Sequence, residues 1–415
     1  MSNRSCINFR MAGLATGLLV FVVVGCEREG PANESEVSEL PYELGVASNL
    51  EFAGFAEGSD DLLVSDALHA TWHGDGELLL IDQRAPGAWL LDPLGEVIRR
   101  VGQAGDGPGE YRSPRYGGFL GDSAIWISDS ELRRITVWDR GDGSVLSASS
   151  APVERLREGG MRAEGRWLMD SGLTLGVPVL EFPPRPGVVT MAWPVPIWTG
   201  SEATATVLVD LSPVPLQGRM VFGTEDQRVN MVVLPQAFDG VPLQGTFDGG
   251  AQFFVVDRSE AAERPEAGVT IWISDSSADS VRHIRIAAQP PSVPGPWRDR
   301  LEAEARILAD AIPPHPTFGA ASEERILEAT WIPSYLPPIR NAFFDVEGIW
   351  LEEVPAEPSS STVVWSRYDL EGGKLGEVEL PSRFRGLAGR RNAIVGFVMD
   401  SLQVPQLERY DVSGY

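Results

Sequence analysis

The runs ELLLID (77–82) and AIWISD (124–129) both consist of apolar residues that end in an aspartate. Each is followed by a second apolar segment that ends in a turn, AWLLDPLG (88–95) and ITVWDRGDG (135–143). Runs this short, bracketed by turn residues and rich in β-branched and aromatic side chains, are typical of strands and too short for helices. The stretch from 77 to 143 therefore predicts a repeated unit of short β-strands.

The same pattern recurs along the rest of the chain. Further runs of this kind are WLMD (167–170), FFVVD (253–257), GIWLEE (348–353) and IVGFVMD (394–400). The spacing is 47 residues from Asp82 to Asp129, 41 from Asp129 to Asp170, and 48 from Glu352 to Asp400. These spacings match propeller blades of four strands, whereas a leucine-rich or helical solenoid would repeat at shorter periods or with a period of 3.6.

Two intervals are about twice as long, 87 residues from Asp170 to Asp257 and 95 from Asp257 to Glu352. Either two blades have weak first strands or two blades carry insertions. Insertions are favoured because residues 296–310 combine strong helix formers with apolar residues at helical spacing. The predicted fold is all-β, a six-bladed β-propeller with a short helical insertion near residues 296–310. A pair of β-sandwich domains is the alternative.

The two ends of the propeller sequence suggest how the ring closes. Residues 44–55 can supply one strand and residues 408–412 another, so that the first and last parts of the domain pair within one blade. Closure of this kind removes sheet edges that would otherwise pair with other molecules.

The N-terminus predicts an export signal. Arg4 and Arg10 precede an apolar run, Met11–Val24, that is too short to cross a bilayer as a helix. The following VVGC (23–26) resembles the bacterial lipobox, and this resemblance implies that Cys26 receives lipid and becomes the new N-terminus.

The expected organisation has three parts: a signal peptide at 1–25, a flexible acidic tether at 26–43 and a single propeller domain at 44–415. We expect an exported lipoprotein, periplasmic or facing the cell surface, with the choice between inner and outer membrane left open. The lipid would be its membrane contact.

Composition limits the partners and the chemistry. The chain has 34 basic and 59 acidic residues, a formal net charge of −25, so that a nucleic acid would be repelled. Lys374 is the one lysine, and it lies in a sequence typical of a hairpin turn. If Cys26 carries lipid and Cys6 is removed with the signal peptide, the exported chain has no disulfide.

The loop GQAGDGPGEY (102–111) is the most unusual local sequence. It does not match a phosphate-binding loop, because a strand rather than a helix follows the glycines. One interpretation is structural: the glycines allow positive φ in a tight connection between blades, and Glu110 accepts backbone amides. The other makes Asp106 and Glu110 candidate ligand-binding residues that present their oxygens to the central channel.

Metal and catalytic motifs are weak. The turns DRGDGS (139–144) and DSSADS (275–280) offer oxygen ligands without the order of a calcium loop, and hairpin turns prefer the same residues. His69 and His73 would lie about 13 Å apart on a strand. No catalytic residue, metal ligand or cofactor is assigned. The alternative function is a lyase or hydrolase that uses channel carboxylates and a divalent cation.

Two segments resemble a known family. Residues 98–114, which contain the pattern G-x-G-P-G-E-[FY], resemble the connection between the first two blades in bacterial six-bladed β-propeller lipoproteins related to NHL-repeat proteins. Residues 393–412 are similar to the last blade of those proteins. The resemblance implies a propeller on a lipid tether and implies no reaction, because fold does not determine function. The expected function is a binding module or scaffold for an unknown protein or small-molecule ligand.

Overall fold

The structure is a computed structural model. It describes residues 48–51, 67–83, 86–150, 153–156, 162–179, 187–199, 204–224, 227–233, 238, 240–311, 322–328, 330–399 and 405–412. All of these belong to one unit, Leu40–Tyr415. The predicted signal peptide and tether, including Cys26, lie outside the described residues.

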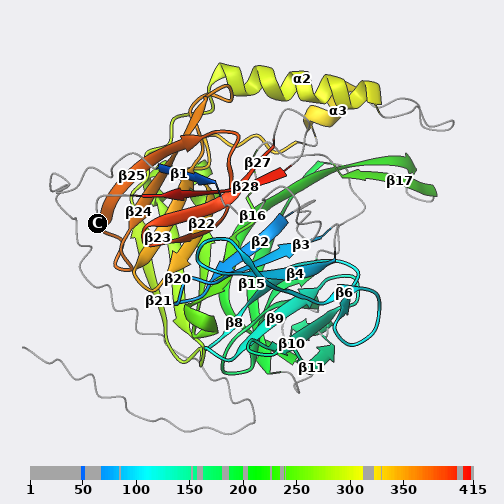
Figure 1. The fold of residues 1–415 in the computed structure, drawn as a ribbon. Coiled ribbons are helices and arrows are strands. Elements are labelled where there is room, and N and C mark those ends of the chain that lie inside the picture. The colour runs from blue at the N-terminus through cyan, green and yellow to red at the C-terminus, as the bar shows by residue number, and fades with distance from the viewer. Residues whose placement is uncertain are drawn as a thin grey trace, which may run out of the picture. The chain divides into compact units, whose positions relative to one another are not determined.

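The described strands form six sheets of four or more strands, in the order in which they occur along the chain (Figure 1). The first contains β2 (Ala67–Trp72), β3 (Leu78–Asp82), β4 (Gly87–Leu91) and β5 (Val97–Val101). The second contains β8 (Pro114–Leu120), β9 (Ala124–Asp129), β10 (Arg134–Asp139) and β11 (Val145–Ser150). The third contains β12 (Val153–Leu156), β13 (Arg162–Leu168), β14 (Leu173–Val179), β15 (Gly187–Thr199), β16 (Thr204–Thr224) and β17 (Gln227–Val233).

The other three sheets have four strands each. The fourth contains β18 (Leu243–Phe247), β19 (Gln252–Asp257), β20 (Val269–Asp275) and β21 (Val281–Ile286). The fifth contains β22 (Ile339–Asp345), β23 (Gly348–Glu353), β24 (Thr362–Tyr368) and β25 (Lys374–Pro381). The sixth contains β26 (Arg385–Arg390), β27 (Ala393–Met399), β28 (Pro405–Asp411) and β1 (Ser48–Glu51).

One strand of each sheet faces the centre of the ring. These inner strands are β2, β8, β13, β18, β22 and β26, and each contacts the next in this order, with β26 contacting β2 again. Neighbouring strands within these six sheets run antiparallel, apart from one additional parallel pairing between β12 and β16. The six-bladed β-propeller predicted from the spacing of the acidic residues is confirmed.

The sixth blade combines both ends of the described chain. β1 pairs antiparallel with β28, with Ser48 opposite Asp411 and Glu51 opposite Glu408. The predicted closure by residues 44–55 and 408–412 is therefore observed at residues 48–51.

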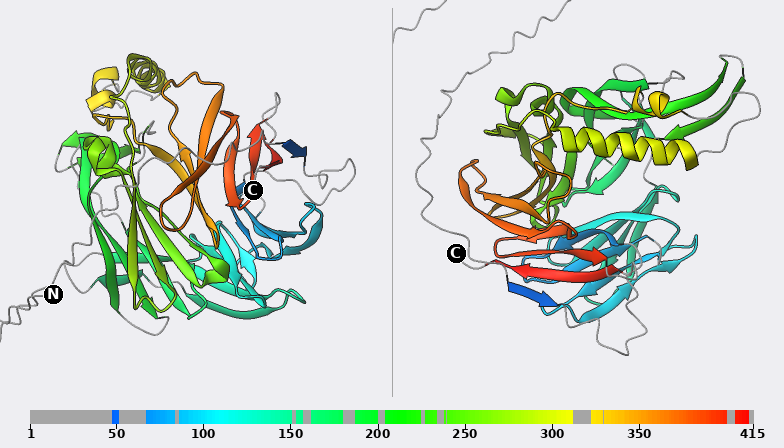
Figure 2. Two further views of the ribbon diagram at one scale, coloured as in Figure 1. Left: turned by 90° about the vertical axis from the view of Figure 1, so that its left-hand side faces the viewer. Right: turned by 90° about the horizontal axis from the view of Figure 1, so that it is seen from above.

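The first long interval contains an extension made of strands. In the third sheet, β15 has 13 residues and β16 has 21, so their hairpin is much longer than those of the other blades. The end of β16 pairs with β17, and Figure 2 shows these two green strands projecting beyond the neighbouring sheets.

The second long interval contains helices. α1 (Ser259–Glu263) and the 3-10 turn η3 (Pro265–Ala267) lie between β19 and β20, and α2 (Gly295–Ala311) and α3 (Glu323–Glu328) lie between the fourth and fifth sheets. α2 confirms the helix predicted at 296–310. It buries Trp297 and Leu301 against Phe238 and Trp331, and the indole of Trp297 donates to the carbonyl oxygen of Pro355 at 3.1 Å. Among the described helices, none is long and apolar enough to span a membrane.

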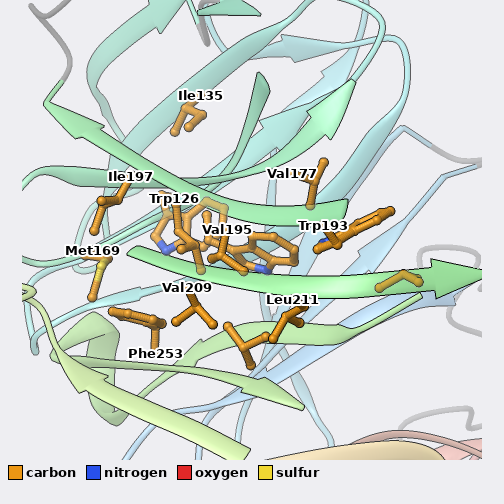
Figure 3. Close-up of a cluster of buried hydrophobic side chains, with 14 residues drawn as sticks. Trp126, Ile135, Met169, Val177, Trp193, Val195, Ile197, Val209, Leu211 and Phe253 are labelled. Atoms are coloured by element: carbon orange, nitrogen blue, oxygen red, sulfur yellow. The ribbon is translucent and has the colours of Figure 1, made fainter. Parts of the chain in front are cut away.

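The hydrophobic core lies largely between blades. Its largest cluster joins Trp126 of β9, Val195 and Trp193 of β15, and Phe253 of β19, which belong to three successive sheets (Figure 3). A second cluster contains the fully buried Trp350 and joins the fifth and sixth sheets. Burying one such ring contributes about 4–6 kcal/mol of gross transfer free energy. The tryptophans therefore hold neighbouring blades together.

The acid at the end of β9 has a structural role. Asp129 is almost fully buried, and its two carboxylate oxygens accept backbone N–H groups of Arg112, Ser113, Glu131 and Leu132 at 2.7–2.9 Å. The same side chain thus closes the following turn and holds the connection from the previous blade. In the second blade, the apolar run that ends in an acid is therefore a buried strand followed by a turn that the acid closes.

Candidate functional site

The centre of the ring contains a cavity of about 670 Å³. Its walls come mainly from the inner strands β2, β18, β22 and β26, and it opens among the turns that follow inner strands. We call this side the turn face, formed by residues 73–77, 121–123, 248–251, 346–347 and 391–392. Because all inner strands run in the same direction round a propeller, side chains from distant parts of the sequence meet here.

His69 and Thr71 of β2 line the cavity and contact the inner strand of the second blade. Nε2 of His69 lies 2.9 Å from the carbonyl oxygen of Gly117, and the hydroxyl of Thr71 donates to the same oxygen at 3.2 Å. Burial lowers the pKa of His69 to about 4, against a smaller opposite effect of the Gly117 hydrogen bond. This imidazole is therefore neutral at physiological pH.

His73 lies in the turn face, where it belongs to a charged network. Its Nδ1 is 2.8 Å from Asp75, its Nε2 is 3.2 Å from Asp122, and its ring packs on Phe119. Arg140 of the second blade reaches across to Asp75. Partial burial would raise the pKa of Asp75, but hydrogen bonds from Glu77 N–H, His73 and Arg140 outweigh it and lower this pKa to about 2.

Two further acids of the cavity wall are paired with arginines. Asp345, at the end of β22, accepts from Nη2 of the fully buried Arg367 at 2.9 Å. Glu347 in the next turn lies 3.1 Å from Arg391. These pairs hold the carboxylates in place and neutralise them locally.

Arg390 ends β26 and lines the cavity beside Trp72 of β2. Its guanidinium carbon lies 4.4 Å from the centre of a Trp72 ring. Burial, together with the positive charge of Arg409, lowers the pKa of Arg390 from its ordinary value. The cavity therefore has a basic, aromatic corner between the sixth and first blades.

Apolar and uncharged polar side chains complete the lining. Leu243, Phe343 and Leu387 contribute apolar surface from three blades. The amide of Gln244 is buried in the wall, and neither its oxygen nor its nitrogen has a hydrogen-bond partner among the described residues. Buried amides normally have partners, so this part of the wall has unused hydrogen-bonding capacity. A mixed lining of this kind can bind an organic molecule that carries a polar group.

Asp106 and Glu110, the sequence-predicted candidates, lie on the connection between the first two blades, apart from the residues that line the cavity. Glu110 accepts the backbone N–H of Gly107 at 2.8 Å and the amide of Gln103 at 3.0 Å. Asp106 is bound by the guanidinium of Arg112. Hydrogen bonds from Gly107 and Arg112, respectively, lower the pKa values of Glu110 and Asp106. Their ligand-binding role stays a prediction.

The structural interpretation of this loop is confirmed. β6 (Gln103–Ala104) pairs with β7 (Glu110–Tyr111), and Gly102 has a φ of +77°. A Cβ at Gly102 would lie 2.3 Å from the ring of Tyr111, so a larger residue would not fit there. The loop also wraps round Arg134, whose guanidinium donates to carbonyl oxygens of the loop, including that of Gly107 at 2.9 Å. The glycines thus allow a tight loop whose carbonyl oxygens hold an arginine of the second blade.

The two other acidic turns satisfy their oxygens locally. Asp139 accepts the N–H groups of Gly141 and Asp142, and Asp275 accepts from Ser277 and Ser280. In the described parts of the chain, no group of three or more His, Cys, Asp and Glu side chains is arranged to hold a metal ion. The divalent cation of the alternative function remains untested.

Sequence reasoning did not identify the cavity residues Trp72, Gln244, Asn341 and Arg390. Their common feature is their place in inner strands, the first strand of each blade, which lack the long apolar runs of the second strands. The sequence signal that could have pointed to the cavity is the presence of a polar residue in each of these first strands. It does not show which of these residues meet, because they come from different blades.

One of three similar solved structures, with a TM-score of 0.50, supports the fold. A member of the DUF4221 family from Bacteroides vulgatus ATCC 8482 has a TM-score of 0.50 at 9% identity, over 90% of this chain and 98% of that one. A protein described as exported, from Bacteroides fragilis NCTC 9343, has a TM-score of 0.45 at 11% identity, over 89% and 95%. Regucalcin from Agrobacterium tumefaciens strain C58, a calcium-binding protein, has a TM-score of 0.38 at 10% identity, over 90% and 96%.

No protein-family model matches the sequence, and no curated protein matches it. At identities this low, structural likeness shows the propeller fold alone. The resemblance to NHL-related lipoproteins therefore stays a prediction from the sequence.

Proposed function

We propose that this protein is an exported, lipid-anchored β-propeller that acts as a binding module for a small molecule held in its central cavity. The observation that carries the proposal is the cavity itself. Its volume of about 670 Å³ falls within the range of roughly 300–1,000 Å³ typical of small-molecule sites. Its lining combines apolar side chains with a few polar groups.

The rigidity of the wall supports this function. The cavity residues lie on inner strands and are held by packing inside the ring. The ring of Phe343, for example, stacks on Trp365 of the same blade with the ring centres 5.3 Å apart. A preformed site loses little conformational entropy when a ligand binds. Sequence variation in the turn face could then tune selectivity without disturbing the blades.

Binding can be tested with three matched probes: naphthalene-2-carboxylate, naphthalene-2-carboxamide and 2-naphthylmethylammonium. We expect at least one to bind with 1:1 stoichiometry in calorimetric titrations. Thr246→Trp and Leu387→Trp, which fill the cavity from two different blades, should each weaken binding about tenfold. Val207→Trp, an exposed position on β16, is the matched control. If none of the probes binds, or the cavity variants bind like the parent, the proposed site is wrong.

Anchoring is supported by the sequence of residues 1–26 and has its own test. Cys26→Ala should abolish lipid labelling and move the protein from the membrane fraction to the soluble fraction. Cys6→Ala, which changes a cysteine within the predicted signal peptide, should leave both unchanged. A Cys26→Ala protein that stays in the membrane fraction would contradict lipid anchoring.

A further inference from the structure

The corner formed by Trp72 and Arg390 joins the two blades that lie beside the ring closure. Trp72 is the last residue of β2 in the first blade, and Arg390 is the last residue of β26 in the sixth. The guanidinium of Arg390 lies over the indole at 4.4 Å from its centre, a cation–π contact. Both residues line the central cavity near the turn face.

Among the described residues, no carboxylate pairs directly with the positive charge of Arg390. Its Nε is buried without a hydrogen-bond partner, and no hydrogen bond or ion pair joins its guanidinium to another described residue. Burying a charge without a partner is costly. The lowered pKa of Arg390 is consistent with that cost, because burial and the nearby Arg409 both disfavour its charged form.

The carboxylates close enough to influence Arg390 bind other arginines. Asp345 accepts from Arg367 at 2.9 Å, and Asp411 lies 2.6 Å from Nε of Arg409. Arg409 also lies near the Trp72 ring, at 5.8 Å from its centre. This corner therefore contains more positive than negative charge, although the whole chain is strongly acidic.

The remaining acids of the cavity wall do not pair with Arg390. Glu347 is paired with Arg391, Asp122 lies 3.2 Å from His73, and Asp248 accepts from the amide of Gln252 at 3.3 Å. A guanidinium offers N–H groups in a fork that matches a carboxylate in two parallel hydrogen bonds. The apolar side chains of Phe343 and Leu387 lie elsewhere on the same wall.

We propose that the cavity binds an amphipathic organic anion, whose carboxylate pairs with Arg390 beside Trp72 and whose apolar body lies against the remaining wall. This inference rests on the proposed function and names the chemical class of the ligand. It also assigns Arg390 as the residue that selects for negative charge.

The three naphthalene probes test this selection because they share one apolar body. We expect the parent protein to bind the carboxylate about tenfold more tightly than the carboxamide, and the ammonium probe most weakly. Arg390→Gln should reduce the preference for the carboxylate to less than about threefold. Arg391→Gln, its neighbour paired with Glu347, is the matched control and should keep the preference.

A second measurement uses only the parent protein, so its result does not depend on whether a variant folds. Raising the NaCl concentration should weaken carboxylate binding by the parent protein and leave carboxamide binding unchanged, because only the charged pair is screened. The melting temperature of Arg390→Gln shows whether lost selectivity reflects a lost fold.

Several outcomes would overturn the inference. These are equal affinity for carboxylate and carboxamide, an unchanged preference in folded Arg390→Gln, or a preference lost in Arg391→Gln. In each case the probes still bind and the proposed function survives. Absence of binding by all three probes would instead reject the proposed function, and this inference with it.

Discussion

At the scale of single residues, His69 shows how the ring changes the chemistry of a side chain. In the chain it is one of 4 histidines with no surrounding motif. In the structure it lies on an inner strand, and its Nε2 contacts the Gly117 carbonyl oxygen of the next blade. Desolvation there disfavours the charged imidazolium, which would otherwise form near pH 6.5.

The protonation of His69 should make stability depend on pH. Its folded-state pKa is lowered to about 4, so between about pH 6.5 and 4 the unfolded chain binds a proton that the folded protein does not. Stability is therefore unaffected by this group above pH 6.5 and falls between pH 6.5 and 4, by on the order of 3 kcal/mol. Urea unfolding measured across this range should show a smaller acid-side loss for His69→Gln than for the parent.

The control for this prediction is His283→Gln, which changes an exposed histidine on β21. It should follow the pH profile of the parent. If the free energy of unfolding falls equally with acid in His69→Gln and in the parent, then His69 does not contribute to the pH dependence.

At the scale of elements, the inner strands carry glycines where side chains of neighbouring blades approach closely. A Cβ at Gly386 of β26 would lie 2.7 Å from Trp365 and 3.0 Å from Phe343. Both rings belong to the fifth blade and stack on each other. Packing between blades therefore depends on small residues in one strand as much as on aromatic residues in the next.

Gly386→Val should destabilise the protein by about 1–3 kcal/mol, because the added methyl groups overpack the contact between the fifth and sixth blades. Denaturant unfolding at neutral pH measures this change. Gly74→Ala is the control, since no atom lies within 4 Å of the Cβ it would add. A folded Gly386→Val as stable as Gly74→Ala would mean that the blades can move apart at no cost.

At the scale of the whole molecule, the ring is completed by two segments from opposite ends of the described chain. β1 supplies the outer strand of the sixth blade by pairing with β28. Without it, the backbone groups of β28 would form an open sheet edge, which favours association with other chains.

Removal of residues 1–51 should therefore lower the melting temperature and promote oligomers, whereas removal of residues 1–43, the predicted signal peptide and tether, should not. Calorimetry and size-exclusion chromatography measure the two effects. If the two deletions instead melt at the same temperature and have the same oligomeric state, then β1 contributes little to closure.

Much of this architecture can be predicted from local sequence. In the second blade, an apolar run and the terminal acid Asp129 mark the second strand, because burial and turn closure are needed within a few residues. Residues 296–310 have helical periodicity for the same local reason. The long β15–β16 hairpin was less predictable, since the sequence showed only an interval too long for one blade.

The candidate site was not predictable in this way. Asp106 and Glu110 attracted attention because their loop is unusual, yet its carbonyl groups enclose Arg134. Trp72 and Arg390 were not candidate site residues in the sequence, and they meet only because the sixth blade packs against the first. The sequence by itself determined the repeat, the helix and the strand positions, because these depend on residues close together in the chain. Only the tertiary structure decided which charges have partners in the central cavity, because ring closure places residues from opposite ends of the sequence against one another.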